Sequence, residues 1–174
     1  MNKLITIALV IFLSGCSSPK ISDYQDTAPA LDLQYFFNGK LVAYGMVLDR
    51  SGALTRRFSV DLNASWQGNK GIIDEQFVFD DGEKTRRVWR LTKLAHNSYQ
   101  GQADDVLGIA SGTTQGAVLH WQYDMMINVD GTDYQVSLDD WMYLIDDKRL
   151  FNKTDIMKFG LKVGELVLYI EKQP

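Results

Sequence analysis

The sequence predicts an all-β protein, an antiparallel up-and-down barrel of roughly 8–10 strands, preceded by an N-terminal targeting segment. Residues 117–129 alternate apolar and polar side chains over their whole length, which is the period of a half-buried strand. Similar runs recur at intervals of roughly 8–14 residues and are separated by short turn signals, so hairpins rather than crossover helices join them. The chain has 174 residues, 45% of them hydrophobic and 23% charged, which is typical of one globular domain.

The N-terminus carries the most specific motif. After Lys3, residues 4–13 form an apolar run that is shorter than the about 20 residues of a membrane span and typical of a signal-peptide core. The segment Leu13-Ser14-Gly15-Cys16 resembles the lipobox of bacterial lipoproteins. The resemblance implies that residues 1–15 are a signal peptide and that Cys16 receives diacylglycerol and a further acyl chain such as palmitate. The alternative is a plain secretory peptide in which the cysteine occurs by chance.

The next segment indicates location and organisation. In Gram-negative lipoproteins an Asp after the acylated Cys typically causes retention in the inner membrane, and this chain has Ser17 there. The resemblance therefore implies a lipid anchor at the periplasmic face of the outer membrane. Residues 16–33, rich in Pro, Ser and Asp, are expected to be the lipidated Cys and a tether, and residues 34–174 the barrel domain. The apolar side chains of residues 31–37 suggest a short helical turn that plugs one end of the barrel.

The strands follow in order. Turn residues such as Asp81-Gly82 and Asp130-Gly131 separate the runs, and residues 153–161 are expected to be a short helix or loop. Closure removes exposed edges, which favours a barrel over a sandwich. A transmembrane barrel is the competing interpretation, but charged and polar residues on one face of 54–66 and 71–80 favour a barrel in water with an apolar interior. The expected strands are 40–49, 54–66, 71–80, 84–94, 98–103, 108–112, 117–129, 133–145, 148–152 and 164–171.

Composition excludes several functions. One Cys and two His exclude a disulfide framework and zinc sites built from several Cys, and a net charge of −4 gives no basic surplus for nucleic acid. The Walker, Gly-x-Gly-x-x-Gly and Gly-x-Ser-x-Gly patterns are absent, so no cofactor and no catalytic residue is predicted. Whether the protein is an enzyme stays open, with the balance towards no.

The chain contains several motifs in a fixed order: Phe37-Asn38-Gly39, Asp81-Gly82, Arg87-Val88-Trp89, Tyr99 to Gly108, Asp139 to Leu144, Asn152 and Lys158-Phe159-Gly160. Together these motifs resemble an uncharacterised family of proteobacterial lipoproteins that is defined only as a domain of unknown function. The similarity extends from about residue 31 to the C-terminus. The barrel pattern also resembles lipocalins and other calycins, although the first strand lacks their Gly-x-Trp; this resemblance implies an apolar ligand inside the barrel.

Charged residues inside strands indicate a candidate site. Adjacent strand residues face opposite sides, so one member of each charged doublet should point inward, where an unpaired charge is costly. The sequence therefore predicts an interior cluster drawn from Arg56, Glu75, Arg87, Asp105 and Asp140. Its members could be structural salt bridges, could bind an anionic head group through an Arg, or could act in acid–base catalysis through Glu75 or an Asp. The aromatic residues expected either to line a ligand cavity or to fill the core are Trp89, Trp121, Tyr123, Trp141 and Tyr143.

These observations lead to three hypotheses. The first is a lipid-anchored binding barrel, attached to the membrane through Cys16, that holds or carries a hydrophobic small molecule such as a fatty acid. The second is a lipid-modifying isomerase or cyclase. The third is a non-catalytic envelope interaction module with a filled barrel. The sequence makes no prediction about oligomeric state.

Overall fold

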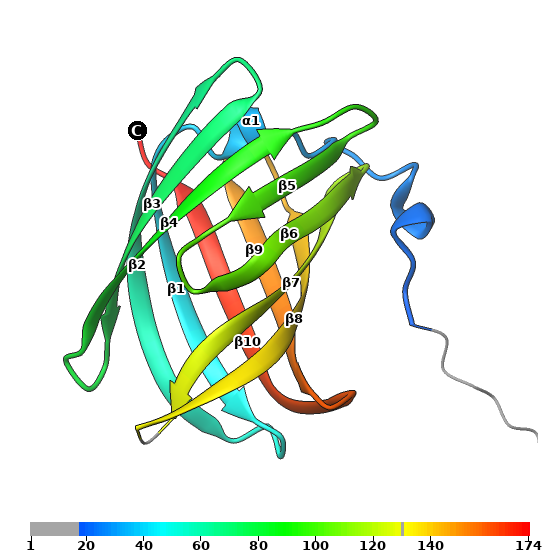
Figure 1. Ribbon diagram of the computed structural model, residues 1–174. Coiled ribbons are helices and arrows are strands. Elements are labelled where there is room, and N and C mark those ends of the chain that lie inside the picture. The colour runs from blue at the N-terminus through cyan, green and yellow to red at the C-terminus, as the bar shows by residue number, and fades with distance from the viewer. Residues whose placement is uncertain (1–17, 130) are drawn as a thin grey trace, which may run out of the picture.

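The computed structural model describes residues 18–129 and 131–174. The proposed signal peptide 1–15, Cys16 and Ser17 lie outside the described residues. Ten antiparallel strands form one closed barrel in which every strand pairs with its neighbours in sequence and β1 pairs with β10 (Figure 1). The predicted all-β up-and-down barrel is therefore confirmed. The strands are β1 Gly39–Asp49, β2 Leu54–Gln67, β3 Lys70–Phe79, β4 Lys84–Lys93, β5 Ser98–Gln102, β6 Val106–Gln115, β7 Val118–Val129, β8 Thr132–Leu144, β9 Arg149–Lys158 and β10 Leu161–Lys172.

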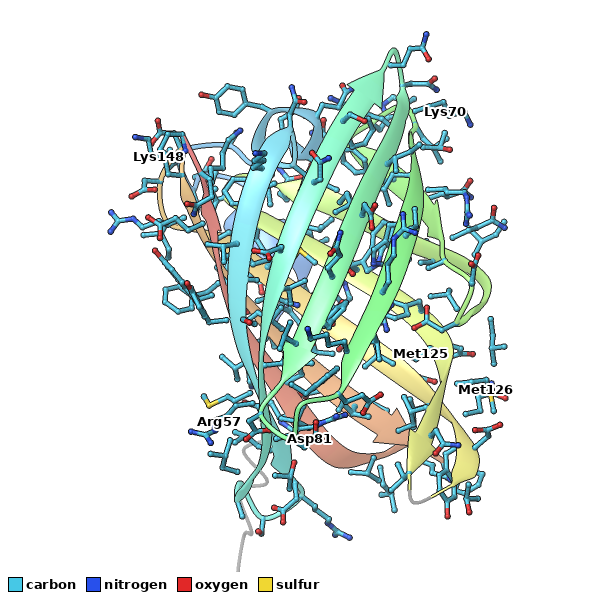
Figure 2. The ribbon with its side chains drawn as sticks, turned by 90° about the vertical axis from the view of Figure 1, so that its left-hand side faces the viewer. Arg57, Lys70, Asp81, Met125, Met126 and Lys148 are labelled. Atoms are coloured by element: carbon cyan, nitrogen blue, oxygen red, sulfur yellow. The ribbon has the colours of Figure 1, made fainter. Side chains whose placement is uncertain are left out.

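Alternation of side chains along each strand decides which face lies inside. In β2, Phe58, Val60 and Leu62 are buried, whereas the intervening Asp61 and Asn63 are exposed. A slip of one residue would turn the apolar set outward, so this pattern fixes the register of the strand. Figure 2 shows side chains along the outside of the barrel, with Lys70 and Lys148 at one end and Arg57 and Asp81 at the other.

Residues 153–161 are strand and turn, not the expected helix or loop. β9 continues to Lys158, and β10 starts at Leu161, which pairs directly with Lys158. The two-residue connection is Phe159-Gly160, with φ of 51° and 77°. Both values are positive, as the tight hairpin turn that matches strand twist requires. Asn152 and Thr154 point inward from β9, and these polar residues interrupt the apolar pattern that the sequence prediction depends on.

A short helix closes one end of the barrel. α1 (Leu33–Phe36) buries Leu33 and Phe36, and the adjacent Leu31 and Phe37 are buried with them. The predicted helical turn that plugs the barrel is therefore present. Within residues 18–129 and 131–174, no helix has the length and apolar character needed to cross a membrane.

Hydrogen bonds hold this plug to strands and turns around the rim. The Asp32 carboxylate caps the helix by accepting from the Gln34 amide at 2.8 Å, and it accepts from Lys93 Nζ of β4 at 2.9 Å. The Gln34 side chain donates to the Gly68 carbonyl in the β2–β3 turn at 2.6 Å. Lys172 of β10 donates to the Tyr35 carbonyl at 2.7 Å. The plug is thus attached to the barrel on several sides.

The described part of the predicted tether docks on the outside of the barrel. The 3₁₀ helix η1 (Ile21–Tyr24) lies beside β6 and β7. Thr27 Oγ1 accepts from the Ala117 amide at 2.8 Å, and the Leu31 amide donates to the Gly116 carbonyl at 2.8 Å. A Cβ atom at Gly116 would lie 2.1 Å from the Tyr24 carbonyl oxygen, so this contact requires glycine. Residues 21–31 consequently form a strap that lies against the barrel.

One side of the barrel wall is incomplete away from the plug. β5 pairs with β4 only over Arg90–Lys93, and β6 pairs with β7 no further along than Met125. Among the described residues, no strand covers the outer edge of residues 84–89 of β4 or of residues 127–129 of β7. Figure 1 shows the β5–β6 turn ending part-way along the barrel, above this notch.

Candidate binding site: an acidic cavity inside the barrel

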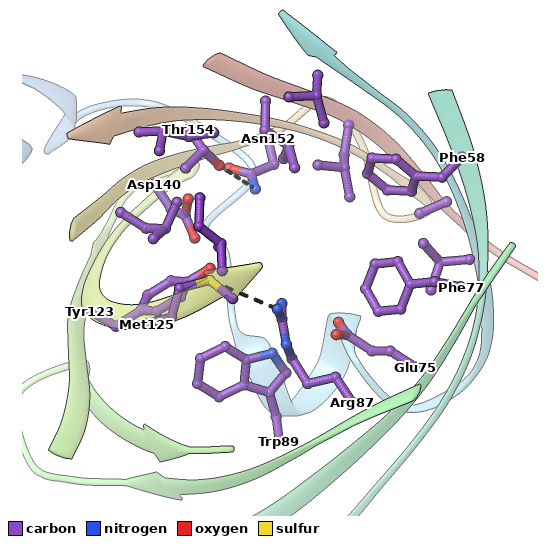
Figure 3. Close-up of a pocket in the computed structure, with 18 of the residues that line it drawn as sticks. Phe58, Glu75, Phe77, Arg87, Trp89, Tyr123, Met125, Asp140, Asn152 and Thr154 are labelled. Atoms are coloured by element: carbon purple, nitrogen blue, oxygen red, sulfur yellow. Dashed lines mark hydrogen bonds between the residues drawn. The ribbon is translucent and has the colours of Figure 1, made fainter. Parts of the chain in front are cut away.

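A cavity of about 920 Å³ occupies the barrel interior. It extends from Leu33 and Phe37 of the plug to Thr55 and Asn128, which lie at the opposite, open end. Most of its lining is apolar, and Figure 3 shows side chains from opposite walls pointing into it. Sites for small molecules are typically concave, mostly apolar and about 300–1,000 Å³ in volume, and this cavity has those properties.

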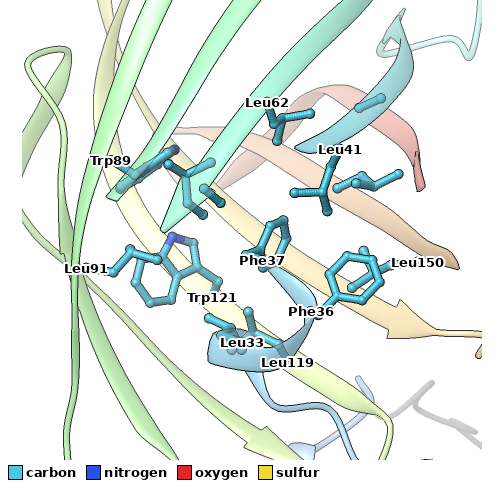
Figure 4. Close-up of a cluster of buried hydrophobic side chains, with 14 of the residues drawn as sticks. Leu33, Phe36, Phe37, Leu41, Leu62, Trp89, Leu91, Leu119, Trp121 and Leu150 are labelled. Carbon is cyan, nitrogen blue, oxygen red and sulfur yellow. The ribbon is translucent and has the colours of Figure 1, made fainter. Parts of the chain in front are cut away.

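The closed end of the cavity is an apolar floor built around two tryptophans. Trp89 and Trp121 meet edge to face with ring centroids 5.9 Å apart, next to Leu33 of the plug (Figure 4). Cβ atoms at Gly101 and Gly112 would lie 2.7 Å and 2.5 Å from the Trp121 ring, so the two glycines provide the space that this ring fills. The floor therefore resembles a packed protein core, and the open space lies between it and the mouth.

Polar side chains from two opposite walls face the open space. Glu75 of β3 and Arg87 of β4 are direct cross-strand partners on one wall. Asp140 of β8, with Asn152 and Thr154 of β9, lies on the other wall (Figure 3). Glu75 is partly exposed, but only to the cavity that encloses it. We call these five residues the polar belt.

Arg87 is held by a residue outside the belt. Its Nε and Nη2 donate to the Asp105 carboxylate in the β5–β6 turn, with the shortest contact at 2.6 Å, and Nη2 also lies 3.8 Å from Met125 Sδ. This bidentate pair joins the part of β4 that has no β5 partner to the turn above the notch, and such a contact suits a structural salt bridge. Because Asp105 already balances the Arg87 charge, little positive potential is left for an anionic ligand.

Two acceptors of the belt lack a donor. Asp140 Oδ1 and Asn152 Oδ1 are buried and make no hydrogen bond within the described residues. The Asn152 amide donates to Thr154 Oγ1 at 3.3 Å, so the free side of that amide is its oxygen. A buried polar atom without a partner costs about 1–3 kcal/mol. The belt therefore contains unused capacity to accept hydrogen bonds.

Burial changes the acidity of both belt carboxyls. Removal from water raises the pKa of Glu75 to about 7, although the nearby Arg87 opposes the change and the neighbouring acidic groups add to it. Burial likewise raises the pKa of Asp140 to about 7, against the opposing effect of a hydrogen bond from Thr154. Burial also raises the pKa of Tyr123 well above its usual value, so that side chain stays a neutral phenol. Near neutrality the belt carboxyls are therefore a mixture of protonated and charged forms.

Arg56 lies at the mouth rather than with the belt. Its Nη2 contacts Asp81 at 2.7 Å and Glu83 at 2.5 Å in the β3–β4 turn, and its guanidinium carbon lies 3.6 Å from the centroid of the Phe79 ring. The predicted inward orientation is correct, but β2 carries this residue close to the end of the barrel. Arg56 is thus separate from the predicted interior cluster.

Trp141 and Tyr143 lie on the outer face and do not line the cavity. Trp141 stacks on His120 at 4.1 Å between ring centroids, and Tyr24 of η1 contacts both Trp141 and Tyr143 at about 6 Å. The physical reason is strand parity, because residues 141 and 143 must face away from the side that Asp140 faces. Trp89, Trp121 and Tyr123 do line the cavity.

The sequence prediction missed Asn152, Thr154 and Met125 as cavity residues. Asn152 and Thr154 alternate with the outward Phe151 and Lys153, and this alternation is the signal that could have identified them. Among the residues that the structure describes, no group of three or more His, Cys, Asp or Glu side chains is arranged to hold a metal ion.

Comparison with known proteins gives a family. No curated protein and no solved structure matches this chain. The family model described as "Protein of unknown function (DUF3833)" matches residues 10–172, which include all ten strands of the barrel. The barrel domain, with its plug and its acidic cavity, therefore belongs to the DUF3833 family of proteins of unknown function.

Proposed function

We propose that this chain is a lipid-anchored envelope lipoprotein that uses its barrel to bind or carry a hydrophobic small molecule, a fatty acid or another lipid-like compound. An acylated Cys16 would hold it at the periplasmic face of the outer membrane, as in the proteobacterial lipoproteins that it resembles. The observation that carries the binding proposal is the cavity of about 920 Å³, which is mostly apolar, closed by α1 and open at the other end.

Three features of the cavity support this proposal. Apolar side chains from eight strands and the plug surround the space, so burial of an alkyl chain there would contribute roughly 0.8 kcal/mol per methylene. The notch beside β4 shortens the wall at the mouth, so a long molecule has room to enter. The calycins, which the barrel pattern resembles, bind small apolar molecules in the same position.

Native mass spectrometry tests the proposal on the full chain, kept in solution by an amphipathic polymer that is too bulky to enter the cavity. We expect additional mass that organic extraction removes, and uptake of a fluorescent lipid by the extracted protein. A clean apo mass together with no uptake contradicts the proposal.

A pair of neighbouring substitutions on β10 controls for folding. Leu168 lines the cavity, whereas Val167 belongs to the opposite face of the same strand. Leu168→Trp should fill part of the open space and reduce lipid uptake, and Val167→Trp should leave uptake unchanged. Equal uptake by both variants would show that the lipid binds elsewhere.

The anchor is tested separately. Metabolic labelling with an alkyne analogue of palmitate should label the full chain. In a separate membrane fractionation, only detergent should release the chain from the membranes. The Cys16→Ser variant should lose both properties, because Cys16 is the only cysteine in the chain. Labelling that survives this substitution contradicts the assignment of Cys16.

A lipid-modifying enzyme is the second candidate, and the belt carboxyls favour it. Two carboxyl groups with pKa values of about 7 face one cavity, and groups that titrate near neutrality are suited to acid–base catalysis. Glu75→Gln and Asp140→Asn should then abolish turnover of a lipid substrate without unfolding the barrel. The interaction-module hypothesis assumed a filled barrel, and the cavity of about 920 Å³ favours the binding proposal over it.

A further inference from the structure

The polar belt provides acceptors and lacks the excess positive charge that an anionic ligand needs. Among the described residues, two arginines and four carboxyl groups line the cavity. Both arginines are already paired, Arg56 with Asp81 and Glu83 at the mouth, and Arg87 with Asp105. Glu75 and Asp140 are the lining carboxyls that form no salt bridge with any residue of 18–129 or 131–174. The side chains around the open space therefore carry a net negative charge whenever Glu75 or Asp140 is ionised.

The unpartnered atoms indicate what a ligand must supply. Asp140 is 3% exposed and Asn152 is 6% exposed, and each leaves its Oδ1 without a donor. Both side chains project into the cavity from the wall opposite Glu75 (Figure 3). The Asn152 amide oxygen and, when Asp140 is ionised, its carboxylate oxygen can accept hydrogen bonds at these positions and cannot donate them.

From this geometry we infer that the bound lipid carries a hydrogen-bond-donating head, either hydroxyl groups or a protonated amine, which lies in the belt between Asp140, Asn152 and Glu75. This inference rests on the proposed lipid-binding function and specifies its ligand class. Hydroxyl or ammonium protons satisfy the free oxygens, and the alkyl chain packs against the apolar lining. A free fatty acid carboxylate would place a further negative charge beside Glu75 and Asp140, which is unfavourable whenever these two groups are ionised.

Arg87 is the cation of the belt that a carboxylate ligand would bind, but acidic side chains already contact or adjoin its guanidinium. Its guanidinium already makes a bidentate pair with Asp105, with the shortest distance 2.6 Å. Its cross-strand neighbour is the acidic Glu75. An incoming carboxylate would therefore have to compete with two acidic groups for one cation.

Three probes with the same sixteen-carbon chain test the inference: palmitate, monopalmitoylglycerol and hexadecylamine. The full chain in the amphipathic polymer is loaded with the neutral fluorophore N-phenyl-1-naphthylamine, and each probe displaces it at about pH 8, where the belt carboxyls are mostly charged. We expect the glyceride or the amine, or both, to displace half of the fluorophore at a concentration about tenfold or more below the concentration of palmitate that does so. The two arms separate a hydroxyl head from an ammonium head.

Variants assign the preference to the belt. Asp140→Asn and Glu75→Gln should each strengthen the displacement of the fluorophore by palmitate relative to its displacement by hexadecylamine. The reason is that each substitution removes one negative charge from the cavity. Asp139→Asn is the matched control, since Asp139 lies one residue away and contacts His120 outside the barrel. It should leave the order of the probes unchanged.

The outcomes separate the two proposals. Palmitate that competes as well as the glyceride and the amine overturns the donor-head inference and leaves lipid binding in place. A fluorophore that never enters, with no probe bound by mass spectrometry, overturns lipid binding itself. An order of probes that is unaffected by both belt variants shows that the preference arises outside the belt, and this also overturns the inference.

Discussion

Replacing Asp140 by Asn should stabilise the barrel above neutral pH. Burial raises the pKa of Asp140 from an ordinary value of 3.8 to about 7. The folded protein binds this proton more tightly than the unfolded chain does. The carboxyl group therefore contributes most to the free energy of unfolding when the pH is below its ordinary pKa. Its contribution is then lost as the pH rises through 7. The difference corresponds to roughly 4 kcal/mol at 1.36 kcal/mol for each tenfold change in proton affinity. The amide never ionises, so Asp140→Asn should avoid this loss.

The assay is urea unfolding of the lipid-free full chain in the amphipathic polymer, followed by tryptophan fluorescence at about pH 5 and about pH 8. We expect the free energy of unfolding of Asp140→Asn, relative to the native chain, to rise by roughly 2–4 kcal/mol between the two pH values. Asp139→Asn controls for a charge lost on the outside of the same strand. A relative stability of Asp140→Asn that is the same at both pH values would refute the assignment of a buried carboxyl with a raised pKa.

Three further changes test other parts of the structure by thermal unfolding. Gly112→Ala should destabilise the barrel by about 1–3 kcal/mol, because a Cβ there would lie 2.5 Å from Trp121 and 2.6 Å from the His120 carbonyl oxygen; no loss would show that the floor is loosely packed. Phe159→Asn should stabilise the β9–β10 hairpin by about 1 kcal/mol, because asparagine tolerates the positive φ of 51° better; a decrease would mean that the exposed ring has a packing role. Asp32→Ala should cost about 1–2 kcal/mol through loss of the α1 cap and of the 2.9 Å contact with Lys93, and an unchanged melting temperature would contradict that attachment.

Strand alternation was sufficient to predict the fold because most inward positions are apolar. The β2 pattern, with Phe58 and Val60 inward and Asp61 outward, can be read directly from the sequence. The same method failed over 153–161, where the inward Thr154 is polar and the exposed Phe159 is not. Composition misleads at such positions because the belt needs polar groups inside.

The site residues were predicted correctly where the alternation of inward and outward side chains along a strand, their parity, was used. They were predicted incorrectly where only the aromatic character of a residue was considered. Parity placed Glu75, Arg87 and Asp140 inside, and the structure agrees. Trp141 and Tyr143 were assigned to the cavity as large aromatic residues although their parity opposes that of Asp140. No sequence pattern shows that Tyr24 covers them from outside, because that contact joins segments more than a hundred residues apart. The pairing of Arg87 with Asp105 likewise depends on where the β5–β6 turn ends.

The composition of the belt is itself an argument for a ligand. Replacing buried ionic groups by apolar residues of similar volume is often neutral or stabilising, so stability alone does not favour Glu75, Asp140 and Asn152 inside this barrel. Leaving Asp140 Oδ1 and Asn152 Oδ1 without donors costs a further few kcal/mol when no ligand is bound. A bound head group that donates to those oxygens would recover this energy. Occupancy should therefore raise the melting temperature, and Asp140→Asn should reduce that increase. An apolar ligand without a head group would leave the belt unsatisfied and should stabilise both proteins equally.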